Sequence, residues 1–300
     1  MIKRVVEVSN APAYISATLD QLELRFPERE GPPVSIPCED LGALVVDQRQ
    51  VTYSHHGLAT LMKHGTVVVL CGGNHLPVGM VLPLSDHLEV VSRIHDQIAL
   101  SKPVRKSLWR QLVVAKIRAQ AGNLGGDTPA RRRLMEMSRT VRSGDPSNME
   151  AQAAKLYWAN WLGEGRAFRR DPDGDGINAL LNYGYALMRA SVARALVGAG
   201  LNTALGIHHC NRSNAFCLAD DLVEPLRPMV DAAVRKLDEA GIGTIQPKAK
   251  SELLGLLHGT VVFEGDTCPM MNGVQKMAYS LVRCIQGSDS NLWIPESSMD

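Results

Sequence analysis

Residues 206–228 hold a concentration of side chains that can bind a divalent cation. This segment contains two adjacent imidazoles and three carboxylates, namely His208, His209, Asp220, Asp221 and Glu224. Because residues three or four apart share a helix face, Asp220 or Asp221 can lie beside Glu224. A site with both imidazole and oxygen ligands suits Mn²⁺, Mg²⁺ or Zn²⁺. The segment therefore predicts a metal site that needs one more ligand from elsewhere in the chain.

Glu150 is a candidate for that further ligand. It lies in a predicted helix with small and apolar neighbours, so a carboxylate facing inward there needs a partner. A divalent cation would satisfy it, but so would an arginine. A capping box from Ser147 to Glu150, with the spacing S-x-x-E, would also give this carboxylate a purely structural role. The local spacing leaves these alternatives open.

Two other motifs could bind metals but fit their sites poorly. His209, Cys210 and Cys217 could supply three zinc ligands, yet no fourth thiol or imidazole lies nearby in the sequence. Residues 171–176 imitate the opening of a calcium loop, but the twelfth position is Asn182 and cannot close such a loop with a bidentate carboxylate. We therefore interpret residues 171–176 as an exposed acidic turn.

The net charge of +1 conceals a strongly basic stretch. Residues 98–142 contain eleven basic and two acidic side chains, which gives +9 there and −8 for the rest of the chain. Such a field attracts polyanions and makes their binding depend on salt. We expect contacts to a nucleic-acid backbone here, with a merely solvated helix face as the alternative. The predicted contact residues are Arg131, Arg132, Arg133, Lys102 and Arg105.

Composition is that of a globular protein, with 300 residues of which 45% are apolar and 21% charged. A chain of this length can bury a large core and usually forms two domains. Six cysteines without paired spacing are typical of reduced thiols. The first residues lack a secretory pattern, and the apolar runs are too short to span a bilayer. We therefore expect a cytoplasmic protein.

The elements that must position these residues follow two different periods. Alternating apolar residues predict strands at 5–9, 22–26, 34–38, 43–47, 66–71 and 76–82, interrupted by one helix at 55–63 that Ser54 caps. Helical periods predict helices at 86–100, 103–122, 129–142, 147–162, 177–198, 222–240, 249–258 and 273–286. The sequence thus predicts the α+β class, with a small β-rich N-terminal domain at 1–84, a linker at 83–86 and a larger all-helical domain at 85–300.

Three regions of the chain together resemble a known family. Residues 148–158 match N-x-E-x-x-A-A-x-x-Y-W, residues 178–187 match N-A-x-L-N-Y-G-Y-A-L with one position unspecified, and residues 206–228 combine G-x-x-H-x-N with D-L-x-E-P-x-R-P. This pattern resembles the CRISPR adaptation integrase, the endonuclease-like family that inserts new spacers into a CRISPR array. In its compact length, the chain further resembles the members of this family that accompany a single-protein RNA-guided effector nuclease.

The resemblance implies a catalytic metal, Mg²⁺ or Mn²⁺, held by Glu150, His209 and Glu224. It places Asp221 where a further acidic residue often lies near the site, and it makes His208 a neighbour of the ligand. The implied reaction is transesterification, in which the 3′-hydroxyl of a DNA fragment attacks a phosphodiester at the edge of a repeat. The implied partners are DNA, a second copy of the chain bound through the N-terminal β domains, a small ferredoxin-like second adaptation protein in a hetero-hexamer, and the effector nuclease.

Two other functions stay open at this point. The same metal site could serve a stand-alone nuclease that acts on branched DNA or RNA and admits water as the nucleophile. A DNA-binding scaffold without catalytic activity is the third hypothesis, although such a scaffold has no need for three converging metal ligands.

Overall fold

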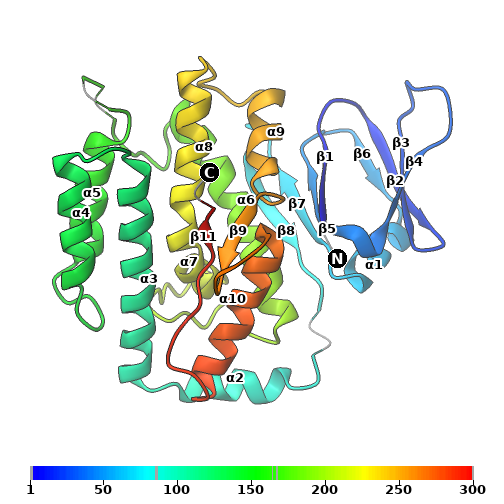
Figure 1. Cartoon of the computed structure of the whole chain (residues 1–300). Coiled ribbons are helices and arrows are strands. Elements are labelled where there is room, and N and C mark those ends of the chain that lie inside the picture. The colour runs from blue at the N-terminus through cyan, green and yellow to red at the C-terminus, as the bar shows by residue number, and fades with distance from the viewer. Residues whose placement is uncertain (1–2, 85–86, 164, 167, 299–300) are drawn as a thin grey trace.

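The N-terminal part of the chain forms two four-stranded sheets. The structure is a computed structural model that describes residues 3–84, 87–163, 165–166 and 168–298. The first sheet has the order β1-β5-β7-β8, and only β8 is antiparallel to its neighbour. Its strands are β1 (Arg4–Val8), β5 (Leu41–Val46), β7 (Val67–Cys71) and β8 (Pro77–Val81). Figure 1 shows these sheets at one end of the molecule, with helices filling the other end.

The second sheet, of order β4-β3-β2-β6, packs against the first. Its strands are β2 (Ala13–Thr18), β3 (Gln21–Arg25), β4 (Val34–Pro37) and β6 (Val51–Tyr53), and a short 3₁₀ helix η1 (Cys38–Asp40) follows β4. β2 and β6 are additional to the six strands that the alternation predicts. β6 has only three residues, which is too short for a pattern of period two to be distinctive.

The strand β5 is the shared wall between two hydrophobic cores. Ala43 and Val45 belong to the core formed with the helices, whereas Leu44 and Val46 belong to the core between the two sheets. Alternate residues of a strand point to opposite faces, so a strand that is apolar throughout is buried on both sides. The first sheet is therefore packed directly against the helical part, and the domain boundary between residues 84 and 85 stays a prediction.

Helices make up most of the chain after residue 87. The helices of the chain are α1 (His55–Lys63), α2 (Val90–Ala99), α3 (Lys102–Asn123), α4 (Pro129–Thr140), α5 (Met149–Asn160), α6 (Ile177–Gly198), α7 (Cys217–Val223), η2 (Glu224–Leu226), α8 (Arg227–Glu239), α9 (Pro247–Gly255) and α10 (Met270–Ile285). α6 is the central helix, with thirteen buried residues. None of the described helices has the length and apolar character needed to cross a membrane.

The α+β class is confirmed, and most predicted helices lie within a few residues of their observed bounds. The Ser54 cap of α1 is also confirmed, since its side chain accepts a hydrogen bond from Gly57 N at 3.0 Å. The C-terminal part is mainly helical but not all-helical: β9 (Thr260–Phe263), β10 (Asp266–Pro269) and β11 (Glu296–Ser297) form a third sheet. Residues 85 and 86 of the predicted linker lie outside the described residues.

Two prolines shape the segment that carries the predicted acidic ligands. The sequence predicts one helix over 222–240, but α7 ends at Val223 and a 3₁₀ turn carries Glu224 into α8. Pro225 and Pro228 lack the backbone N–H that a continuous α-helix needs at these positions. The break places Glu224 in a tight turn between two helices, buried against α3.

Candidate metal centre

The carboxylate of Asp221 organises the loop that carries His209. It is buried, and it accepts four hydrogen bonds: from the backbone N–H groups of Ile207, His208 and His209 at 2.6, 3.0 and 3.1 Å, and from His209 Nδ1 at 2.7 Å. The last bond raises the pKa of His209, with burial acting in the opposite direction. Since Asp221 accepts four hydrogen bonds from this loop, it positions His209, and its predicted role as a further metal ligand stays a prediction.

Glu150 and Glu224 converge on the ammonium group of Lys116. Lys116 Nζ lies 2.5 Å from Glu224 Oε2 and also forms an ion pair with Glu150 Oε1. The three residues come from α3, α5 and η2, so separate segments of the fold meet at this point. A place where two carboxylates hold one cation is electrostatically suited to a metal ion. In the sequence, Lys116 stands out only as part of the basic stretch, and its position here was not predicted.

The electrostatics of this cluster depend on burial and charge together. Burial by itself would lower the pKa of Lys116, but the charges of Glu224 and Glu150 outweigh it and raise that pKa. Burial by itself would raise the pKa of Glu224, but Lys116 and Arg227 lower it. Arg227 Nη2 lies 3.2 Å from Glu224 Oε1, so this buried carboxylate has two cationic neighbours. Lys116 and Glu224 therefore stabilise each other's charged form.

Asp145 fixes the start of α5 and with it the position of Glu150. Its carboxylate accepts hydrogen bonds from the backbone N–H groups of Met149 at 2.8 Å and Glu150 at 2.9 Å. Asn148, at φ 51°, is the residue before the helix and makes no side-chain cap. The predicted capping box from Ser147 is therefore wrong, because the carboxylate of Asp145 accepts the hydrogen bonds from the free N–H groups of Met149 and Glu150. The sequence signal for this cap is an aspartate followed by proline shortly before the helix.

His208 stacks on Trp109 of α3. The ring centroids are 4.0 Å apart and the planes differ by 4°, while His209 meets the same indole edge-on at 5.8 Å. Trp109 is buried and His208 is exposed, so the stack anchors the outside of the loop to α3. The two adjacent histidines thus have different contacts, since His208 stacks on the indole whereas His209 donates a hydrogen bond to Asp221.

Asp220 is likewise committed to a neighbour. Arg189 Nε lies 2.7 Å from Asp220 Oδ1, and the Arg189 guanidinium stacks on the Phe216 ring at 4.9 Å. Asn214 Nδ2 also donates to Asp220 Oδ2 at 2.6 Å. These contacts attach residues 211–216 to α6, and they leave Glu224 as the carboxylate of this segment that faces the cluster.

The donor set fits a divalent cation once the ammonium group moves. No three His, Cys, Asp or Glu side chains in the described part of the chain are close enough to hold a metal ion in the present arrangement. Glu150 and Glu224 nevertheless already bind one cationic group, the ammonium of Lys116. The charges of His209 and Glu224 also influence each other's pKa. His209 Nε2 makes no hydrogen bond to any described residue, so it is available as a ligand.

A buried polar network lies behind the cluster. Tyr185 donates a hydrogen bond to Asp231, and Arg227 lies over the Tyr185 ring at 4.9 Å. Complete burial raises the pKa of Asp231 to about 7. The motif at 178–187 therefore supplies a tyrosine beneath Arg227, while Asn178 and Asn182 hold residues 169–172 through hydrogen bonds.

The two alternative metal motifs, the zinc candidate at 209–217 and the calcium-like turn at 171–176, are not arranged as metal sites in the described part of the chain. Cys217 is buried and its Sγ lies 3.3 Å from the carbonyl oxygen of Asn214, whereas Cys210 is exposed beside His209. In the calcium-like turn, Asp171 N donates to Asn178 Oδ1 at 2.9 Å and Asp173 N to Asp171 Oδ1 at 3.0 Å. The turn is thus fastened to the first turn of α6 by its own backbone.

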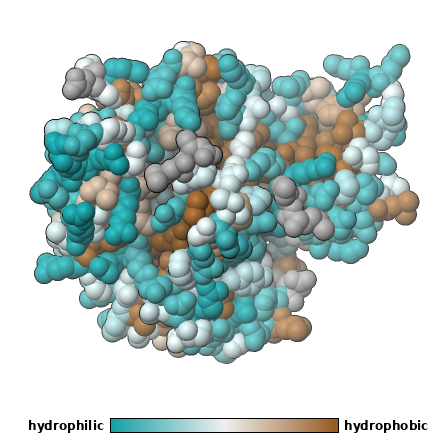
Figure 2. Space-filling model, in the orientation of Figure 1, coloured by the Kyte–Doolittle hydropathy of each residue, from teal (hydrophilic) through white to brown (hydrophobic). Residues whose placement is uncertain are grey.

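The predicted nucleic-acid contacts fall into two groups. Lys102, Arg131, Arg132 and Arg133 are exposed, although Arg132 pairs with Asp127 and Arg133 with Glu136. Figure 2 shows mainly hydrophilic side chains over the part of this face where α3, α4 and α5 lie. Beside it lies a groove of about 1730 Å³ whose lining includes Arg110, Arg118 and Arg131 together with many apolar residues of α8 and residues 292–295.

Arg105 has a structural position that the sequence did not predict. Its guanidinium donates to the carbonyl oxygens of Gly206 at 2.7 Å, Gln97 at 2.8 Å and Leu100 at 3.2 Å. It therefore ties α2 and α3 to the start of the His209 loop. Its predicted contact with DNA does not suit this position, because the guanidinium is used inside the fold.

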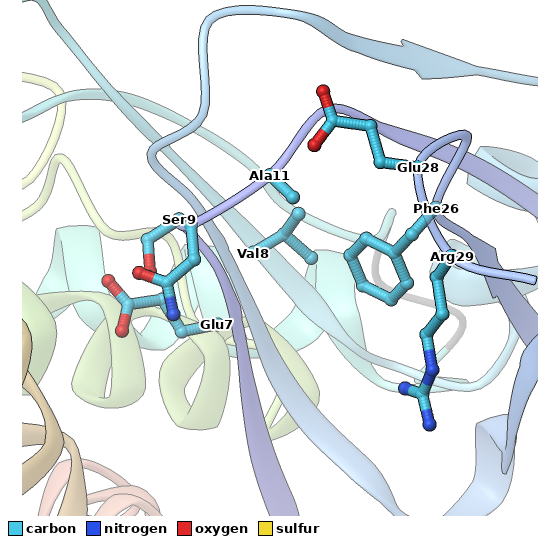
Figure 3. Close-up of a pocket in the computed structure, with 8 residues that line it drawn as sticks. Glu7, Val8, Ser9, Ala11, Phe26, Glu28 and Arg29 are labelled. Atoms are coloured by element: carbon cyan, nitrogen blue, oxygen red, sulfur yellow. The ribbon is translucent and has the colours of Figure 1, made fainter.

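A smaller hollow lies between the two N-terminal sheets. It measures about 310 Å³ and is lined by residues from 7–11 and by Phe26, Glu28 and Arg29. Figure 3 shows that Glu7 and Glu28 lie apart within it and that Arg29 extends away from both. Its charged groups do not converge, so the cluster at Lys116 is the stronger candidate for chemistry.

Comparisons with known proteins give consistent similarities. Residues 8–248 match the family model described as CRISPR associated protein Cas1. The chain is 35% identical over 257 residues to a CRISPR-associated endonuclease Cas1 of Neisseria meningitidis serogroup C, covering 84% of each chain. A casposase bound to an integration product has a TM-score of 0.79 at 19% identity, with 96% of this chain and 92% of the other covered. A Cas6-RT-Cas1–Cas2 complex has a TM-score of 0.77 at 16% identity, with 99% and 36% covered.

Proposed function

The chain belongs to the Cas1 family of CRISPR-associated proteins, and on this premise we propose that it is a divalent-metal-dependent DNA integrase. Its substrate would be a short DNA fragment, and its product that fragment joined to a CRISPR array. The observation that carries the proposal is the convergence of Glu150 and Glu224 on one cation, beside an imidazole that Asp221 orients. The Neisseria meningitidis relative is named an endonuclease, and the similar casposase is bound to an integration product, which supports the same class of reaction.

In the proposed mechanism, Glu150, Glu224 and His209 hold the cation, Mg²⁺ or Mn²⁺. A cation held there would act as a Lewis acid, and its chemistry would be to polarise the phosphodiester and offset the charge that develops on its oxygens. Asp221 keeps Nδ1 of His209 protonated, so that Nε2 is the ring nitrogen left to bind the cation. Arg227 keeps Glu224 ionised and therefore able to act as a ligand.

The reaction exchanges one phosphodiester for another. The 3′-hydroxyl oxygen of the incoming fragment forms a bond to phosphorus, and the bond from phosphorus to the existing 3′-oxygen breaks. The attacking hydroxyl gives its proton to solvent, and the departing 3′-oxygen takes one proton from solvent to become a hydroxyl. The number of P–O bonds is unchanged, so no external energy source is needed. The residues of the site contribute charge and position, and no protein nucleophile is required.

We further propose that the protein acts with DNA and a small Cas2 partner. The Cas1–Cas2 complex among the similar structures supports this partner, and Lys102 and Arg131–Arg133 are exposed where a phosphate backbone could bind. A homodimer through the N-terminal sheets, a contact with the effector nuclease, and the single-effector branch of the family remain predictions from the sequence.

The deciding experiment is integration of a labelled short DNA duplex into a supercoiled plasmid that carries a repeat. It should be run with and without the Cas2 partner, in Mg²⁺, Mn²⁺ or EDTA. We expect metal-dependent covalent joining that His209→Ala and Glu150→Gln abolish, while His95→Ala on the exposed face of α2 serves as the histidine control. Metal-dependent cutting without joining would support the stand-alone nuclease instead. Salt-sensitive binding without chemistry in either metal would leave only the scaffold.

A further inference from the structure

Lys116 is an unusual residue to find at the centre of a candidate metal site. It projects from the buried face of α3, next to Leu112, Val113 and Ile117, and its side chain is only 10% exposed. Lysine is rarely buried without a charged partner, because removing its ammonium group from water is costly. Here both partners are the carboxylates assigned above to the cation, so the ammonium group and a metal ion would compete for the same oxygens.

We propose that the ammonium group of Lys116 is the internal counterion of this site. It exchanges with the divalent cation and then binds the DNA phosphate. The inference rests on the proposed metal-dependent function and adds a residue that contacts the substrate. In the metal-free protein, Lys116 would hold Glu150 and Glu224 together. When the cation binds, the ammonium group leaves the carboxylates but stays within reach of the reacting phosphate.

The charge of the cluster supports this exchange. Lys116 and Arg227 contribute two positive charges, and Glu150 and Glu224 contribute two negative charges, so the metal-free cluster is neutral. A divalent cation and a phosphodiester together add one positive charge, and the second negative charge that develops in the transition state restores neutrality. Without Lys116, the metal-free cluster would carry a buried negative charge, which is unfavourable.

The exposure of the two carboxylates gives the direction of the movement. The Glu224 side chain is 9% exposed and that of Glu150 is 26% exposed, so the cluster opens to solvent on the Glu150 side. A lysine side chain has four flexible methylene groups and can move its ammonium group without moving the helix. The displaced group would therefore move toward the opening through which a DNA backbone must approach.

The first test measures Mn²⁺ binding without DNA, by calorimetry on EDTA-treated protein. Lys116→Met keeps the length of the side chain and removes the charge, and Lys106→Met is the control on the exposed face of α3. We expect Lys116→Met to bind Mn²⁺ at least about tenfold more tightly than the wild type, because one competing cation is gone. The control should bind like the wild type. Equal or weaker binding by a folded Lys116→Met protein would overturn the exchange.

A second measurement needs no variant. Amine-reactive labelling followed by mass spectrometry reports the accessibility of Lys116 in the wild-type protein, with Lys102 and Lys106 as internal references. We expect Mn²⁺ to raise the labelling of Lys116 several-fold relative to these exposed lysines. Unchanged labelling at saturating Mn²⁺ would show that the ammonium group stays on its carboxylates, which would overturn the exchange even if Lys116→Met does not fold.

The two proposals fail in different ways. If the wild type binds no Mn²⁺, or if His209→Ala and Glu224→Gln leave binding unchanged, the metal site itself is wrong and the exchange is wrong with it. If those two variants lose binding but Lys116→Met does not gain affinity, the metal site stands and Lys116 is only a structural ion pair. A loss of joining activity in Lys116→Met with tighter Mn²⁺ binding supports the contact with the phosphate.

Discussion

The carboxylate of Asp221 and the imidazole of His209 are joined by a 2.7 Å hydrogen bond from His209 Nδ1 to Asp221 Oδ1. The same carboxylate oxygen accepts the backbone N–H of His209 at 3.1 Å, so the ring is held in relation to its own main chain. A protonated Nδ1 leaves Nε2 as the donor atom for a metal. The pair therefore has the geometry by which a carboxylate orients a metal-binding histidine and increases its basicity.

Asp221→Asn should weaken divalent-metal binding by about 10- to 100-fold, the range typical for partners of a metal-binding histidine. The amide would direct an N–H group at backbone donors and could not accept all four hydrogen bonds. Asp220→Asn is the matched control, since Asp220 pairs with Arg189 and should leave metal affinity nearly unchanged. Mn²⁺ binding by calorimetry measures both variants. A larger loss from Asp220→Asn would show that the assignment of the two aspartates is reversed.

Asp145→Ala should lower the free energy of unfolding by about 0.5–2 kcal/mol, the usual contribution of a helix cap. Its carboxylate accepts two backbone N–H groups at the start of α5, and no other described side chain replaces it there. Ser147→Ala should have almost no effect, because the predicted capping box is not formed. Urea unfolding of the two variants gives a direct comparison. Equal losses would mean that Ser147 caps the helix in solution after all.

The fold class and the helices could be predicted from the sequence because their signals are local. α6 is found at the predicted bounds, 177–198, since its apolar period is long and uninterrupted. The strands β9 to β11 were not predicted because each is short, and because β11 joins the hairpin of β9 and β10 from a distant part of the chain. The break at Glu224 follows from Pro225 and Pro228, which lack the backbone N–H groups that one continuous helix over 222–240 would need.

The metal ligands could be proposed from residue types and from the resemblance, whereas the positions of their neighbours could not. Lys116 and Arg105 lie in a basic stretch, and nothing in their local sequence separates them from the exposed lysines and arginines nearby. Only the packing of α3 against α5 and η2 shows that Lys116 faces inward. The different roles of Asp220 and Asp221 could not be predicted either. Asp221 is bound by the irregular loop at 207–209, and Asp220 is bound by Arg189, which lies far from it in the sequence.

Changing Arg131, Arg132 and Arg133 together to alanine should reduce the salt dependence of DNA binding. Each phosphate contact contributes about one unit to the slope of log K against log salt, so the slope should fall by about 2 to 3 units. Arg25, Arg29 and Lys63 changed together to alanine make a control of equal charge, located at the end of β3, in the turn after it and in α1. Binding titrations between about 50 and 200 mM salt, a range in which such contacts have large effects, measure the slopes. Similar slopes for both variants would show that the arginines of α4 do not contact the DNA backbone.

The stability of the protein should depend on pH through Asp231. Complete burial raises the pKa of this carboxyl group to about 7, while hydrogen bonds from Tyr185 and Tyr157 partly oppose that rise. In the unfolded chain the pKa of an aspartate is about 3.9. Between these two values the folded protein binds more protons than the unfolded chain, so this group makes the protein less stable as the pH rises from about 4 to about 7.

Asp231→Asn removes this titration and keeps an oxygen that can accept the hydrogen bond from Tyr185. The stability of the variant relative to the wild type should therefore increase between pH 5 and pH 8 by about 2.7 kcal/mol, because only about two of the roughly three units of pKa difference lie within this range. Tyr185→Phe should have the opposite effect, because the loss of its hydrogen bond raises the pKa of Asp231 further and extends the decline to higher pH. Urea unfolding at four pH values from 5 to 8 gives both differences. The difference in the free energy of unfolding between Asp231→Asn and the wild type could instead stay constant over this range. Asp231 would then keep the same protonation state throughout, because Arg227 and Lys116 stabilise its charge more than burial opposes it.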